Sequence, residues 1–77
     1  MAKLEGVEME GSVFKLIELT GTSSKSLEEA VQGAIAEAAK SVRHMSWFQI
    51  TDTRGTIVNG KVGEWQVTLK IGFKIEA

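Results

Sequence analysis

Trp47 and Gln66 are the residues of this sequence whose types and positions suggest a binding site. In HMSWFQI, residues 44–50, Phe48 and Ile50 alternate as in a half-buried strand, so Trp47 falls on the opposite, more polar side. An indole offers a flat surface for stacking, and a glutamine amide can donate to and accept from an imide-like edge. Together they would suit a flat ring with a polar rim.

Trp47 has two interpretations that the sequence leaves open. Tryptophan is favoured in subunit interfaces, where this side chain would simply fill the space between two copies of the chain. The alternative is a ligand platform, and two indoles brought together by symmetry would clamp a ring between them. Offset stacking adds about 0.5–1.5 kcal/mol per ring pair beyond area burial, so a single exposed indole would be a weak site.

The other polar residues do not form a catalytic or metal-binding set. His44 is the only histidine, beside Arg43 at the expected end of a helix, where a cation suits the helix dipole; contact with a phosphate is the alternative. No Ser-His-Asp set is credible, and GTSSKS, residues 21–26, lacks the spacing of a phosphate-binding loop. The acidic residues are scattered, with no EF-hand or HExxH pattern. We predict no catalytic residue and no metal ligand.

Three cations, Arg54, Lys70 and Lys74, are candidates for contact with a charged ligand tail. By strand alternation Lys74 shares the face of Trp47. Arg54 does not, but it adjoins a glycine and a predicted bend. Exposure to solvent without any ligand is the alternative for all three.

Size and composition indicate one small domain. The chain has 77 residues, a formal net charge of −1 and no cysteine, so we expect no nucleic-acid partner, no membrane partner and no disulfide framework. Its apolar runs are far shorter than the roughly 20 residues of a membrane helix, and no secretory signal is evident, so we expect a cytoplasmic protein. We predict an N-terminal arm over residues 1–11 and a single domain over residues 12–77. So small a core seldom contributes more than about 3–5 kcal/mol, which favours self-association.

The pattern along the chain predicts the order β-α-β-β. Residues 12–20 carry apolar side chains on both faces, as in a strand covered on both sides, and residues 21–26 are predicted as a loop. An S-x-x-E capping box begins at Ser26, and apolar residues follow at i, i+3 and i+4 spacing, which predicts a helix over residues 27–43. Its inner stripe is mostly alanine, so it can lie close to a sheet. The class is α+β, with one helix on a small antiparallel sheet in two layers.

The last two strands, predicted over residues 46–55 and 64–75, flank Asn59-Gly60, a pair typical of a two-residue hairpin turn. With that turn, residues whose numbers sum to 119 face each other. Trp47 then lies opposite Gly72, with Gln66 on the same face. A bulge near TDTRG would shift the pairings close to the turn. On this register, the predicted helix side consists of Phe48, Ile50, Asp52 (opposite Val67), Trp65, Val67, Leu69, Ile71, Phe73 and Ile75.

Three segments resemble the bacterial dodecins: FKLIELTGTSSKSLEEAVQGAIAEA, VRHMSWFQITDTRG and VGEWQVTLKIGFKIE. The resemblance covers about residues 13–76, and its most specific parts are ELTGTS, RHMSWF and WQVTLKIGF. It implies a three-stranded antiparallel sheet wrapped around one helix. It also implies assembly into a hollow homododecamer.

The same resemblance implies flavin storage and sequestration rather than turnover. Two isoalloxazine rings are expected to stack between symmetry-related tryptophans, with Trp47 at the tryptophan position and Gln66 bonding the pyrimidine edge. FMN, riboflavin or FAD is the expected cofactor, and coenzyme A is a further ligand of some relatives. Arg54 and Lys74 are our candidates for the flavin phosphate.

Two alternatives come from other functional classes. A flavin-dependent redox enzyme would need an open position beside the reactive ring, which a ring held between two indoles does not leave. A ligand-free structural or partner-binding oligomer would use Trp47 only as an interface residue.

Overall fold

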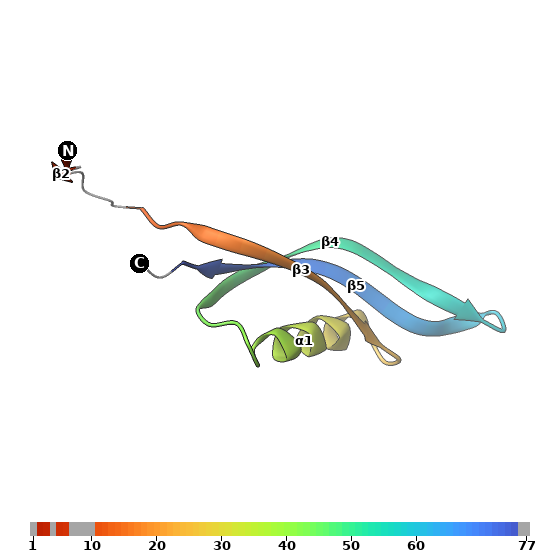
Figure 1. Ribbon diagram of the computed structural model, residues 1–77. Helices are drawn as coiled ribbons and strands as arrows, with labels where there is room; N and C mark the ends of the chain where they lie inside the picture. Colours follow the sequence, from red (N-terminus) through yellow and green to blue (C-terminus); the bar gives the residue numbers. More distant parts are fainter. Residues whose placement is uncertain (1, 4, 7–10, 76–77) are drawn as a thin grey trace.

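A computed structural model of the protein describes residues 2–3, 5–6 and 11–75. The elements are β1 (Ala2–Lys3), β2 (Glu5–Gly6), β3 (Phe14–Ser23), α1 (Leu27–Ala38), β4 (Met45–Val58) and β5 (Lys61–Lys74) (Figure 1). The predicted β-α-β-β order is confirmed for the domain. Most of the predicted arm, residues 1, 4 and 7–10, lies outside the described residues.

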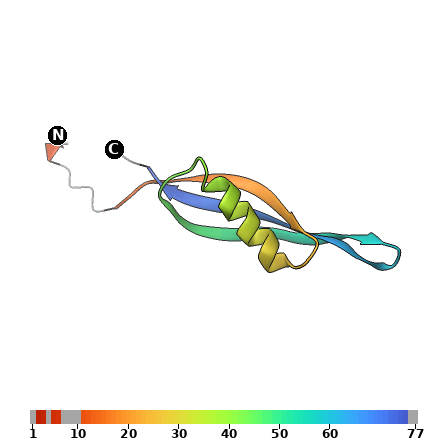
Figure 2. The same cartoon turned by 90° about the horizontal axis from the view of Figure 1, so that it is seen from below.

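β5 is the central strand of an antiparallel sheet with the order β3-β5-β4, and α1 packs beneath β3 and β5. Seen from below, the helix crosses the strands obliquely, and the β4–β5 hairpin extends well beyond it (Figure 2). We call the side of the sheet that carries α1 the helix face and the other side the open face. On β5 the helix face holds Trp65, Val67, Leu69 and Ile71, and the open face holds Gln66, Thr68, Lys70 and Gly72.

The buried core is small and lies between α1 and the middle of β5. It consists of Ala30, Ala34, Ala38, Val67, Leu69 and Ile71. Alanine allows the helix backbone to lie close to the sheet. At Gly21 on β3 the approach is closer still, because a Cβ there would overlap the backbone carbonyl of Ala30. The predicted alanine stripe is therefore the surface by which the helix packs.

The helix begins as predicted but ends earlier. The Ser26 hydroxyl accepts a hydrogen bond from the Glu29 backbone N–H at 3.0 Å, which is half of the capping box. The Glu29 carboxylate instead accepts from the Ser23 hydroxyl at 3.4 Å. The prediction of a helix to residue 43 was wrong: α1 ends at Ala38, and Lys40 and Ser41 make the tighter i→i−3 bonds.

His44 lies six positions beyond the end of α1 and so is not in its last turn, where the sequence had placed it. It adopts a left-handed backbone conformation with φ of 63° in the turn into β4, and its carbonyl accepts from the Lys74 backbone N–H at 3.1 Å. The loop prediction for residues 21–26 was also partly wrong. β3 continues to Ser23 because its ladder with β5 runs as far as Trp65.

The hairpin turn at Asn59-Gly60 is confirmed, with φ of 54° and 75° at its two residues. The predicted register holds beside the turn, and it holds again where Trp47 faces Gly72 and Ile50 faces Leu69. Between these regions it is shifted by one residue, because Gly63 on β5 and Thr51 on β4 are each left unpaired as bulges.

The shift reverses the predicted faces in the middle of β4. Asp52, predicted opposite Val67 on the helix side, lies opposite Thr68 instead, and Thr53 faces Val67. Arg54 lies opposite Gln66, so it belongs to the open face, contrary to the strict alternation. A bulge adds one residue to one strand only, which inverts the inside-outside order until a second bulge restores it.

Candidate functional site

Trp47 lies on the open face directly above Gly72. A Cβ at Gly72 would overlap the six-membered ring of the indole, so only glycine leaves room for the ring in this position. The side chain of Phe14, from β3, packs against the indole with a centroid separation of 4.8 Å and an interplanar angle of 57°. Trp47 nevertheless remains 45% exposed. The result is a positioned, accessible aromatic surface.

Leu16 and Phe14 complete an apolar surface around the indole. Leu16 faces Gly72 from the β3 side, and both residues are exposed. The sequence indicated that β3 has two apolar faces, but it did not show which strand would bring that second face beside Trp47. The sheet order settles this, because β5 places only Gly72 between β3 and β4 at this level.

Gln66 lies at the centre of a chain of four polar side chains on the same face. Its Oε1 accepts from Arg54 Nε at 2.8 Å, and its Nε2 donates to Glu64 Oε1 at 3.1 Å. Arg54 Nη1 in turn donates to Asp52 Oδ2 at 2.9 Å. Asp52 and Glu64 were not among the predicted site residues. The sequence suggested a bulge near TDTRG, but not that it would fall at Thr51 and bring Asp52 to this face.

The two halves of the predicted site are well separated within one chain. Gly72 and Gln66 are six positions apart on β5, which is about 20 Å at the rise of a strand. Trp47 and Gln66 thus share a face but do not meet. Lys74 lies two positions beyond Gly72, also on the open face, opposite Phe14.

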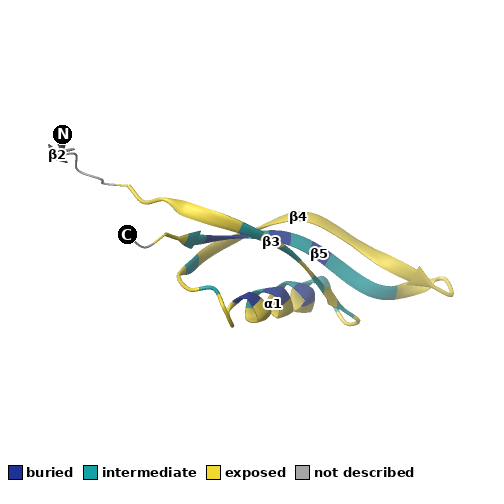
Figure 3. Ribbon diagram, viewed as in Figure 1, coloured by how far each residue is buried: buried dark blue, intermediate teal, exposed yellow. Residues whose placement is uncertain are grey.

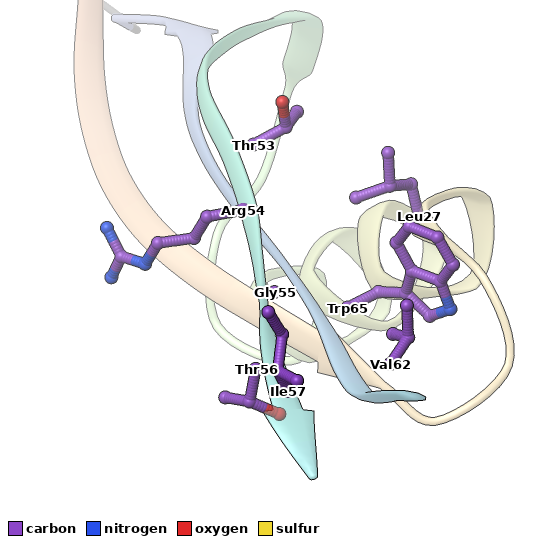
Figure 4. A pocket seen from close by; sticks show the side chains of 8 residues that line it. All are labelled: Leu27, Thr53, Arg54, Gly55, Thr56, Ile57, Val62 and Trp65. Atoms are coloured by element: carbon purple, nitrogen blue, oxygen red, sulfur yellow. The ribbon is translucent and has the colours of Figure 1, made fainter. Parts of the chain in front are cut away.

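Two of the hollows in the described structure lie towards opposite ends of the sheet. One, of about 350 Å³, is lined by Leu27, Trp65 and the hairpin residues Ile57 and Val62 (Figure 4). Figure 4 shows the Arg54 side chain directed away from Leu27 and Trp65, as its register requires. Trp65 itself is half-buried on the helix face, as predicted.

The second hollow lies at the opposite end of the sheet. Its volume is about 470 Å³, and its lining includes Arg43, His44 and Lys74. These three basic residues come from the turn before β4 and from the end of β5. The sequence suggested a phosphate contact for His44 and Lys74 separately, and the structure brings them to one hollow.

Within the described ranges, no group of three or more His, Asp or Glu side chains is arranged to hold a metal ion. No helix among the same residues is long and apolar enough to cross a membrane. The chemistry that the structure does provide is stacking on Trp47 and amide hydrogen bonding at Gln66.

Comparison with known proteins identifies the family. The family model for dodecin matches residues 13–76. This chain belongs to the dodecin family. Dodecins are small flavin-binding oligomers and are binding proteins rather than enzymes, so the prediction that the chain is not an enzyme is confirmed.

Relatives of known structure agree with this fold. The dodecin of Thermus thermophilus is 48% identical over 66 residues, which is 86% of this chain and 96% of the relative. A crystal structure of a Thermus thermophilus protein superposes with a TM-score of 0.83 at 48% identity, covering 87% of this chain and 98% of the other. The dodecin of Streptomyces coelicolor gives a TM-score of 0.83 at 38% identity, covering 90% and 99%.

Proposed function

We propose that this dodecin stores flavin in a hollow homododecamer, with isoalloxazine rings stacked between Trp47 and the same residue of a symmetry-related copy. The observation that carries the proposal is the indole itself, which is held over Gly72 and against Phe14 yet is 45% exposed. A residue that only filled the protomer's core would be covered by the helix, and this one lies on the other side of the sheet.

A second copy of the chain is needed to complete such a site. A single indole covers one side of a ring and contributes only about 0.5–1.5 kcal/mol of specific stacking. Gln66 of the same chain lies about 20 Å along the strand, which is too far to reach a ring stacked on Trp47. The pyrimidine edge of that ring would therefore meet the Gln66 of a symmetry-related copy.

The charged tail of FMN or FAD has candidate partners at two places. Arg54 lies beside Gln66, and Lys74 lies near Trp47 at the basic hollow that also includes Arg43 and His44. Coenzyme A, another phosphate-bearing ligand, would suit the same hollow. Contacts between these basic side chains and a phosphate would favour FMN and FAD over riboflavin, which has no phosphate.

Storage gives the stacked indole a physical purpose. Tryptophan is a good electron donor to an excited flavin, so ring contact with Trp47 would quench flavin fluorescence and suppress its photochemistry. A ring enclosed between two indoles, with a second flavin beside it, has no free face for a redox substrate. This arrangement suits sequestration and not turnover.

The proposal is tested by titrating FMN, riboflavin and FAD with the purified protein while flavin fluorescence is followed. We expect tight binding with strong quenching. Gln66→Leu should weaken binding by roughly ten- to a hundredfold, because a lost hydrogen bond and an unpaired imide edge together cost about 1.4–2.8 kcal/mol. Quenching of the flavin that still binds should persist.

Two outcomes would contradict this function. A colourless protein that leaves all three flavins fluorescent would be a ligand-free oligomer, and Trp47 would then be an interface residue. Steady oxidation of NAD(P)H with a defined acceptor would instead make the protein an enzyme. Gln49→Leu, the same change on the same face but on β4 opposite Lys70, is the matched control for Gln66→Leu.

A further inference from the structure

The amide of Gln66 is held in one orientation by its two neighbours. Arg54 Nε lies 2.8 Å from Oε1, and Glu64 Oε1 lies 3.1 Å from Nε2. A guanidinium group can only donate, and a carboxylate can only accept. The amide oxygen must therefore face Arg54 and the amide nitrogen must face Glu64, since the reverse orientation would oppose donor to donor and acceptor to acceptor.

Counting hydrogen-bonding positions shows what remains for a ligand. A glutamine amide has two acceptor lone pairs and two N–H donors. Arg54 uses one lone pair and Glu64 uses one N–H, so one acceptor and one donor are left. An imide edge presents an N–H next to a carbonyl, which matches this remainder one for one.

The support for this orientation extends beyond the two direct neighbours. Arg54 is itself fixed by its bond to Asp52 Oδ2 at 2.9 Å, and Asp52 reaches the open face only because of the bulge at Thr51. Gln66 and Glu64 are both half-buried, whereas Arg54 and Asp52 are exposed. The amide thus lies between charged groups that both anchor it and limit what it can bind.

We propose that Glu64 and Arg54 are positioning residues that set the specificity of Gln66 for a ring with an imide N–H. The inference rests on the proposed flavin site, because it assigns to Gln66 the pyrimidine edge of the isoalloxazine. Glu64 has the decisive role, because it accepts a hydrogen bond from one of the two N–H groups of the Gln66 amide and so makes that group unavailable to a ligand. Without it, Gln66 would have a surplus donor and would tolerate edges made only of acceptors.

Glu64→Lys is the sharpest test of this assignment. A lysine replaces the acceptor beside Nε2 by a donor, so the orientation that Arg54 and Glu64 hold together is no longer held. Such a site no longer presents a fixed acceptor to an imide N–H. Riboflavin methylated at the imide nitrogen presents only carbonyls at that edge, so it does not need that acceptor.

The experiment measures the dissociation constants of riboflavin and of its imide-methylated derivative by fluorescence quenching. Both probes lack a phosphate, so a loss of phosphate contacts cannot affect the result. For Glu64→Lys we expect the riboflavin constant to rise about tenfold, the energy of one neutral hydrogen bond, while that of the methylated derivative changes by less than about twofold. The ratio of the methylated derivative's dissociation constant to that of riboflavin should therefore fall by about tenfold.

Two further variants separate positioning from a general structural effect. Glu64→Gln keeps an acceptor for the Gln66 N–H and should preserve the wild-type ratio. Glu37→Lys makes the same charge change at an exposed helix position, where Glu37 contacts Lys40 at 3.0 Å, and should also preserve it. A general structural defect in Glu64→Lys would weaken the binding of both ligands equally, so a loss confined to riboflavin cannot come from such a defect.

The outcomes distinguish this inference from the proposed function. If wild-type protein quenches riboflavin and Glu64→Lys leaves the ratio unchanged, the positioning role is wrong and flavin storage stands. If wild-type protein binds neither probe, both are wrong. A lowered ratio in Glu64→Lys, with Glu64→Gln and Glu37→Lys unchanged, establishes the role of Glu64.

Discussion

The helix face of the sheet buries apolar side chains in the core, whereas the open face leaves large apolar side chains exposed. Under the helix, the buried residues are three alanines together with Val67, Leu69 and Ile71. The open face instead exposes Phe14, Leu16 and Trp47. Figure 3 shows the beginning of β3 and most of β4 in the colour of exposed residues. The buried side chains are thus alanines and other aliphatic residues, whereas those exposed on the open face include two aromatic rings.

A third region, β4 and its hairpin, reinforces this difference. Phe48 and Ile50 lie on the helix face by register, but the helix does not extend over them and they are exposed. Near the turn, Ile57 is 79% exposed and Val58 is also exposed. The helix is long enough to cover β5 but not the whole sheet. These exposed side chains are what a member of an oligomeric family would bury against other copies of itself.

The largest effect on the folded chain is expected from Leu69→Ala. Leu69 is fully buried between β5 and the alanine stripe, so its truncation should lower the free energy of unfolding by about 2–5 kcal/mol. Urea denaturation of the wild-type and variant proteins measures this. Leu16→Ala on the open face makes the same chemical change. Equal losses in both variants would show that the open face is covered as completely as the helix face.

The sequence predicted those parts of the fold that have local signals. The Asn59-Gly60 turn, the Ser26 cap and the alanine stripe are each determined by neighbouring residues, and each was predicted correctly. The helix end was missed, because Lys40 and Ser41 form i→i−3 bonds although apolar residues continue at helical spacing beyond Ala38. The continuation of β3 to Ser23 was missed for a similar reason, since pairing with β5 overrides the turn-forming composition of the segment.

The site was only partly predictable. Placing Trp47 opposite Gly72 needed only a turn and a count of residues, and the register agrees. Arg54 was assigned to the wrong face because the bulges at Thr51 and Gly63 depend on how two strands pair over their whole length. Glu64 was missed because one glutamate among scattered acidic residues has no signal until its partner is known.

A second, intermediate effect is expected from Ile50→Lys, which places a charge on the uncovered part of the helix face. The protomer core does not include Ile50, so the helix and sheet should still form. Assembly should be lost, since a buried unpaired ammonium in an interface is costly. Light scattering should show about twelve chains for the wild type and only a few for the variant. Ile50→Val, which keeps the site apolar, should assemble normally; a fully assembled Ile50→Lys would place this surface outside the interfaces.

The smallest effect on the fold is expected from Trp47→Ala, which should nevertheless abolish tight flavin binding. Circular dichroism and particle mass should match the wild type, because the indole lies outside the core. Trp65→Ala is the matched control on the helix face. It should lower the melting temperature and leave quenching by the remaining indole intact. If Trp47→Ala fails to assemble, the indole is an interface residue and the comparison between the two faces must be redrawn.

The two bulges of the hairpin compensate each other. The unpaired Gly63 shifts the pairing of β4 with β5 by one residue, and the unpaired Thr51 shifts it back before Trp47 is reached. Only the five pairs between the two bulges have the shifted register, and Arg54 opposite Gln66 is one of these. The polar half of the open face therefore has the shifted register, and the aromatic half around Trp47 has the unshifted one. Losing either bulge alone would invert the faces of one half relative to the other.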